Sequence, residues 1–107
     1  MKIRIIEEFW GVNSRTGTRS TRQTDEKVFV PMIGDTMEMP VGRRKFTVDA
    51  ADENAVTITV HYENNPLANK TWVIAPNDSV FYRPRSMDGG YQYKIVYEEG
   101  NYGISGK

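Results

Sequence analysis

The sequence predicts an all-β protein, built as a single antiparallel β-sandwich of about eight short strands, with a small β-barrel as the alternative. Three observations lead to this prediction. Apolar and polar residues alternate along short runs, no window of about eleven residues repeats its apolar residues at the helical period, and turn-forming residues separate the runs about every ten residues. At 107 residues, the chain has the length of one domain, so we expect residues 1–107 to share one core.

The clearest strand is AVTITVHY, residues 55–62. Because side chains alternate between the two faces of a strand, one face is apolar and the other polar: Val56, Ile58, Val60 and Tyr62 against Ala55, Thr57, Thr59 and His61. The same pattern predicts the remaining strands, over Lys2–Trp10, Lys27–Met32, Thr36–Met39, Arg44–Val48, Lys70–Ile74, Ser79–Arg83 and Tyr91–Glu98. Short polar clusters with glycine or proline connect the runs, as expected for an antiparallel fold without helical crossovers.

Two segments depart from this pattern. GVNSRTGTRSTRQTDE, residues 11–26, contains Val12 as its single aliphatic residue and is longer than the usual connection between strands. We expect a long polar loop here, either mobile or functional, and the two polar arms of a long hairpin are the third interpretation. The glycine-rich end of the chain, from residue 100, is expected to be a flexible tail.

The residue types leave little room for catalysis. The chain has no cysteine, which excludes disulfides, thiolate nucleophiles and cysteine-bound zinc, and its single histidine, His61, excludes a histidine metal site. Adjacent acids such as Glu7 and Glu8 point to opposite faces of a strand, so they do not form a catalytic carboxylate pair. No phosphate-binding glycine motif is present. We therefore expect no catalytic residue, no metal and no cofactor, and a protein that is not an enzyme.

Charge and hydropathy bear on partners and location. The 14 basic and 14 acidic residues balance, which removes any overall attraction to nucleic acid or to an anionic membrane. The opening residues, MKIRIIEEFW, contain no apolar run long enough for a secretory signal or a membrane span. We expect a cytoplasmic protein without a membrane partner.

The first candidate site lies in RPRSMDGGYQYK, residues 83–94. A two-residue turn at 88–89 would bring four polar side chains to one face of a hairpin, with Arg83 opposite Lys94 and Arg85 opposite Gln92. Like charges that face each other across a strand pair are mildly destabilising, which predicts neutralising acids nearby or an anionic partner. The hairpin tip is therefore a candidate site for a phosphate, a carboxylate or an acidic protein surface, and a solvated tip with local ion pairs is the alternative.

The second candidate is the arginine-rich segment, in which Arg15, Arg19 and Arg22 lie among serines, threonines and glycine. Guanidinium and hydroxyl groups both donate to phosphate oxygens, as in basic arms that bind nucleic acid, but the segment has no aromatic residue for base stacking. A solvated polar loop is the alternative interpretation. Trp10 lies beside this segment and, with Tyr91 or Tyr102, could form the exposed aromatic platform of a carbohydrate-binding sandwich.

These features predict a non-catalytic binding or interaction module. Its partner is expected to be a protein or another anionic ligand, contacted through the loop and hairpin-tip residues Arg83, Arg85, Lys94, Gln92, Arg15, Arg19, Arg22 and Trp10. A nucleic-acid-binding β domain that uses the arginine-rich loop is the first alternative, and a carbohydrate-binding sandwich is the second. An exposed edge strand would allow a homo-oligomer. The prediction depends on whether the two basic groups adjoin in space.

Overall fold

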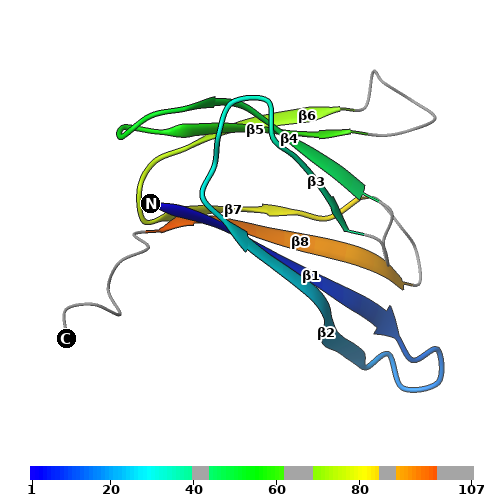
Figure 1. Ribbon diagram of the computed structural model, residues 1–107. Helices are drawn as coiled ribbons and strands as arrows, with labels where there is room; N and C mark the ends of the chain where they lie inside the picture. The colour runs from blue at the N-terminus through cyan, green and yellow to red at the C-terminus, as the bar shows by residue number, and fades with distance from the viewer. Residues whose placement is uncertain (40–43, 62–68, 85–88, 99–107) are drawn as a thin grey trace.

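The computed structural model describes residues 1–39, 44–61, 69–84 and 89–98 of the chain. Figure 1 shows these residues as eight strands in two antiparallel sheets, which face each other and are not closed into a barrel. The predicted all-β sandwich is therefore confirmed. Within the described residues, no helix is long and apolar enough to span a membrane.

Sheet A has the strand order β2-β1-β8-β7, and sheet B has the order β3-β4-β5-β6. In sheet A, β1 (Lys2–Val12) lies between β2 (Arg19–Phe29) and β8 (Gly89–Glu98), and β7 (Asp78–Tyr82) pairs with β8. Sheet B is a meander of β3 (Thr36–Met39), β4 (Arg44–Ala51), β5 (Val56–His61) and β6 (Lys70–Ile74). The chain enters sheet B after β2 and returns to sheet A after β6. In sheet A, the first strand, β1, pairs with the last strand, β8.

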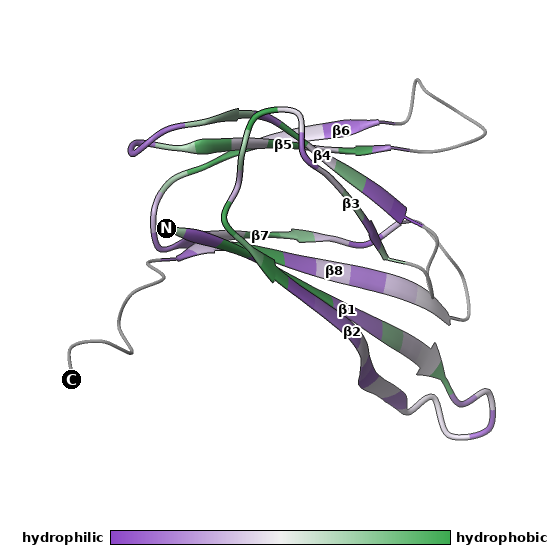
Figure 2. Ribbon diagram, in the orientation of Figure 1, coloured by the Kyte–Doolittle hydropathy of each residue, from purple (hydrophilic) through white to green (hydrophobic). Residues whose placement is uncertain are grey.

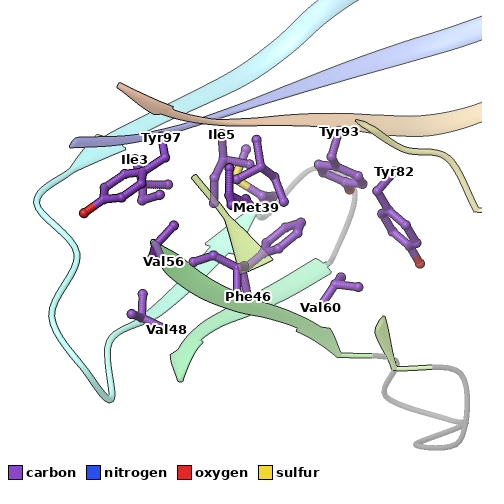
Figure 3. Close-up of a cluster of buried hydrophobic side chains, with 13 residues drawn as sticks. Ile3, Ile5, Met39, Phe46, Val48, Val56, Val60, Tyr82, Tyr93 and Tyr97 are labelled. Carbon is purple, nitrogen blue, oxygen red and sulfur yellow. The ribbon is translucent and has the colours of Figure 1, made fainter. Parts of the chain in front are cut away.

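The core lies between the two sheets, and alternation along each strand determines which side chains fill it. Figure 3 shows the side chains that meet there: Ile3, Ile5, Met39, Phe46, Val48, Val56, Val60, Tyr82, Tyr93 and Tyr97. The predicted apolar face of the strand near residues 55–62 is confirmed, because Val56, Ile58 and Val60 are completely buried.

One carboxyl group is buried at the edge of this core. Glu7 accepts hydrogen bonds from the Tyr93 hydroxyl (2.8 Å) and the Thr24 hydroxyl (2.7 Å). Burial, followed by the hydrogen bond to Glu7, raises the pKa of Tyr93. The phenol therefore keeps its proton and stays a donor to Glu7, which satisfies an otherwise costly buried acceptor.

The segment at residues 11–26, expected to be a long polar loop, is most of a β-hairpin. β1 continues to Val12 and β2 begins at Arg19, so the loop prediction is wrong and the interpretation as two polar hairpin arms is right. Residues 12–23 are all exposed, so neither face of this end of the hairpin packs on the core. Without a buried face, nothing selects for apolar alternation, which is the signal that a strand prediction needs. Figure 2 shows the result as a largely hydrophilic β2.

β7 and β8 pair in a register that differs from the predicted one by two residues. Phe81, not Arg83, lies opposite Lys94, so the predicted opposition of two like charges is wrong. The cause is that Gly89 and Gly90 belong to β8, where they pair with β1. Because side chains alternate with a period of two, a shift of two residues leaves each side chain on its predicted face.

Candidate site for an anionic partner

The hairpin segment at residues 83–94 and the arginine-rich segment at residues 11–26 both contribute side chains to the outer face of sheet A, which points away from sheet B. Ile3 and Ile5 are buried between the sheets, so the even-numbered residues of β1 point outward. Strand pairing and side-chain contacts place four predicted site residues on this outer face together with Trp10: Arg19, Arg83, Gln92 and Lys94.

Trp10 is the centre of this group and is only 5% exposed, although it lies on an outer face. Its partner on β8 is Gly90, which has no side chain, so the indole ring has room to extend across β8 toward β7. Two arginines cover the ring: the guanidinium carbon of Arg19 lies 4.8 Å from the ring centroid, and that of Arg83 lies 5.4 Å from it. Cation–π contacts of this kind are attractive. The two basic groups of the sequence therefore adjoin in space.

Arg83 is held in place by a relay of side chains. Its Nε donates to Gln92 Oε1 (3.2 Å), and Gln92 Nε2 donates to Glu8 Oε1 (2.8 Å). The guanidinium carbon also lies 5.5 Å from the Phe81 ring centroid. These contacts fix the guanidinium group while its terminal nitrogens form no hydrogen bond to a described residue. We call the assembly the Trp10 cluster: Trp10, Arg19, Arg83, Gln92 and Glu8.

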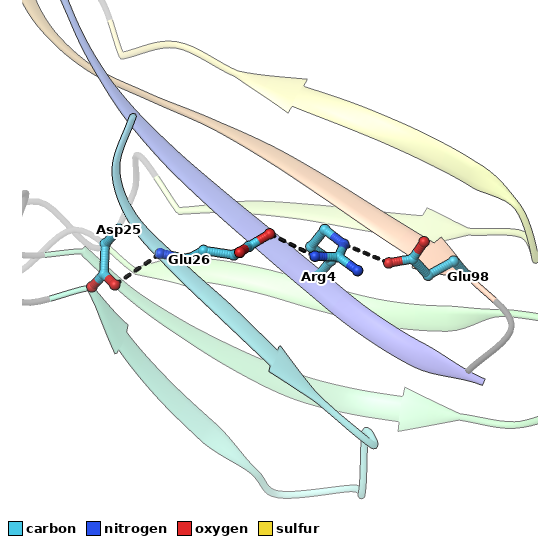
Figure 4. Close-up of polar contacts among 4 residues, drawn as sticks. All are labelled: Arg4, Asp25, Glu26 and Glu98. Carbon is cyan, nitrogen blue, oxygen red and sulfur yellow. Dashed lines mark hydrogen bonds and ion pairs between the residues drawn. The ribbon is translucent and has the colours of Figure 1, made fainter. Parts of the chain in front are cut away.

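Arg4, on the same outer face, shows the contrasting case of a neutralised arginine. Figure 4 shows its guanidinium group between two carboxylates, with Nη1 2.6 Å from Glu26 Oε2 and Nε 2.6 Å from Glu98 Oε1. The hydrogen bond to Glu26, followed by that to Glu98, raises the pKa of Arg4. Within the described parts of the chain, Arg19 and Arg83 have no such ion pair. Among these residues, local ion pairing therefore explains Arg4 but not the arginines of the Trp10 cluster.

The other predicted basic residues do not join the cluster. Lys94 is exposed on the same face, two residues along β8 from Gln92. Arg22 belongs to the opposite face, where its guanidinium carbon lies 5.9 Å from the Phe9 ring centroid. Arg15 lies in the turn between β1 and β2, and Arg85 falls outside the described residues.

The alternative in which Trp10 and Tyr91 form an exposed aromatic platform is wrong. Trp10 is covered on the outer face, whereas Tyr91 lies on the inner side and packs edge-on against Phe9, with ring centroids 5.4 Å apart. The sheet itself therefore separates the two rings. Tyr102, the other suggested member, and the tail from residue 100 lie outside the described residues.

Sequence reasoning missed a hydrogen-bonded network on the outer face of sheet B. The register aligns one threonine from each strand in a row: Thr36, Thr47, Thr59 and Thr71. Thr59 and Thr47 both donate to the Asp49 carboxylate, and the Thr47 hydroxyl also lies 2.8 Å from His61 Nε2. The pairing of β4 with β5 shifts between Val48 and Ala50, so a bulge places Asp49 here, and sequence spacing does not reveal a bulge. Period-two alternation predicts that these threonines share a face, but the row itself depends on the register of the strands.

The described ranges contain no group of three or more histidine, aspartate or glutamate side chains placed to hold a metal ion. No protein-family model matches the chain, and no curated protein or solved structure matches it significantly. The Trp10 cluster is therefore interpreted from its geometry alone.

Proposed function

We propose that the chain is a non-catalytic binding module whose Trp10 cluster contacts an acidic surface of a protein partner. The observation that carries this proposal is the meeting of Arg19 and Arg83 on one indole ring, where neither has an ion pair with a described carboxylate. Because both cations lie over one ring, a single acidic surface can contact both and offset their mutual repulsion. Guanidinium groups that are already held in place lose less conformational entropy when they bind a carboxylate.

The arrangement favours carboxylates over nucleic bases. Base stacking requires exposed aromatic faces along a basic groove. Trp10 is instead covered by Arg19 and Arg83, and the exposed Phe9 belongs to the opposite face of the sheet. A carboxylate needs only the guanidinium N–H groups, and both arginines are exposed to solvent. An acidic protein surface therefore fits the cluster better than a single-stranded nucleic acid does.

Fluorescence anisotropy with two labelled probes tests this proposal: a poly-glutamate peptide and a single-stranded oligonucleotide of similar length. We expect the wild-type chain to prefer poly-glutamate and the Arg19→Gln/Arg83→Gln variant to bind it at least about tenfold more weakly, because two charge-assisted contacts are lost. The matched control is Lys45→Gln/Lys70→Gln, which removes two exposed positive charges from sheet B. This control should keep the wild-type affinity.

Three outcomes would contradict the proposal. Absence of poly-glutamate binding would contradict the proposal that the partner is acidic. Preference for the oligonucleotide would favour a nucleic-acid-binding β domain instead. An equal loss of affinity in both double variants would show that net charge, rather than the Trp10 cluster, determines binding.

A further inference from the structure

A shallow hollow lies at the end of the molecule where β1 begins and β8 ends. Its volume is about 250 Å³, and it is lined by Met1, Val30, Pro31, Ala51, Asp52, Glu53 and Tyr97. Five of these seven lining residues have uncharged side chains, and the two charged side chains are both acidic. The Tyr97 hydroxyl donates to the Asp52 carbonyl oxygen (2.8 Å), which fixes the tyrosine ring as one wall.

Neither acid of the hollow is neutralised by a described cation, since the ion pairs in these ranges are those of Arg4. One Asp52 carboxylate oxygen caps its own turn and accepts from the N–H groups of Asn54 (2.7 Å) and Ala55 (3.0 Å). Glu53 is exposed and has no hydrogen bond within the described ranges. Apolar walls beside carboxylates that form no ion pair with a described cation suit a side chain with an apolar stem and a cationic head, as in arginine.

The opposite end of the same molecule presents such side chains. β1 runs from the hollow to the β1–β2 turn, and its 11 residues separate the two by roughly 35 Å at about 3.4 Å per residue. Figure 1 shows the N-terminus and this hairpin turn at opposite ends. Arg15 and Arg19 are exposed there and have no ion pair with any described residue.

The turn that carries Arg15 is well defined. The Asn13 side chain accepts from the Arg15 backbone N–H (2.9 Å), and the Asn13 backbone N–H donates to the Thr18 carbonyl (2.8 Å). Gly17 adopts a φ of 72°, a conformation that favours glycine. The arginines are thus presented on an ordered tip, which lowers the entropic cost of binding through them.

We propose that the hollow binds the arginine turn of a second copy of the chain, so that molecules associate head to tail. The inference rests on the proposed function, because it identifies the acidic surface that the basic end of the molecule contacts. The separation of turn and hollow prevents this contact within one molecule. Arg15 and Arg19 of one copy would lie against Asp52 and Glu53 of the next. Such a contact joins different surfaces of the two copies, so it extends into chains or closes into a ring.

Sedimentation velocity over a range of concentrations tests this inference with two variants. Asp52→Asn/Glu53→Gln removes the charges of the hollow, and asparagine keeps the oxygen that caps the turn. Arg15→Gln/Arg19→Gln removes the charges of the hairpin tip. We expect the wild-type chain to associate beyond the dimer, and each variant alone to remain monomeric. An equimolar mixture of the two variants should form dimers and nothing larger, because one intact hollow then meets one intact turn.

The control Glu38→Gln removes an exposed acid from β3 and should associate as the wild type does. A wild-type chain that stays monomeric at every concentration, or a mixture of the two variants that stays monomeric, would overturn the head-to-tail contact. The hollow variant keeps Arg19 and Arg83, so its binding to poly-glutamate separates the two proposals. If poly-glutamate binding persists without self-association, only the inference about the second copy fails. If the wild-type chain binds no poly-glutamate, the proposed function fails.

Discussion

At the scale of single residues, glycine is needed at position 89 because β8 approaches β1 closely there. A Cβ atom added at Gly89 would lie 2.8 Å from the backbone carbonyl oxygen of Trp10, closer than real Cβ contacts. The sequence suggested turn geometry as the reason for the glycine pair, whereas the structure places both glycines inside a strand. The space beside Trp10 that Gly90 leaves open is part of what allows the indole ring to meet Arg83.

Replacing Gly89 with alanine tests this account of the close approach. We expect Gly89→Ala to lower the free energy of unfolding by about 1–3 kcal/mol, because backbone atoms must move to admit the added methyl group. Urea denaturation measures the loss. Ser20→Ala, on exposed β2, is the control and should stay within about 0.5 kcal/mol of the wild type. A Gly89→Ala protein as stable as the wild type would show that the strands separate without cost.

At the scale of strands, the sequence predicts an element well where one of its faces is buried. Alternation located the strands β1, β4, β5 and β8 and assigned the faces of β5 and β8 correctly. It missed the first half of β2, which has no buried face, and the register of β7 with β8, which depends on how the glycines pair with β1. The basic residues of the candidate site could be predicted, but their meeting on Trp10 could not, because it joins three separate strands through one ring.

The same reasoning predicts uneven stability along β2. Backbone amides near Thr21 and Arg22 lie in an exposed part of the hairpin, whereas Ile5 and Ile95 are completely buried. We expect hydrogen exchange by NMR at low protein concentration to show much weaker protection at Thr21 and Arg22 than at Ile5 and Ile95, because an exposed hairpin end opens without global unfolding. Equal protection at all four positions would mean that the hairpin end unfolds only with the core.

At the scale of the whole molecule, zero net charge conceals a separation of charges. Residues 1–45 hold nine basic and six acidic residues, and residues 46–107 hold five and eight. Strands from the two halves pair with each other. Even so, arginines without an ion pair to a described residue lie at the β1–β2 end, and acids without an ion pair to a described residue line the hollow at the other end. If both proposals hold, we expect the charges at the two ends to favour association with copies of the chain and with acidic partners.

The emission of Trp10 gives the most direct test of the claim that the Trp10 cluster is the binding site. The chain has two tryptophans, so Trp72→Phe leaves Trp10 as the only one. We predict that poly-glutamate changes the emission of this variant saturably, with the midpoint found by anisotropy, and that adding Arg19→Gln/Arg83→Gln abolishes the change. Binding detected by anisotropy without any change in Trp10 emission would contradict the claim and place the partner elsewhere.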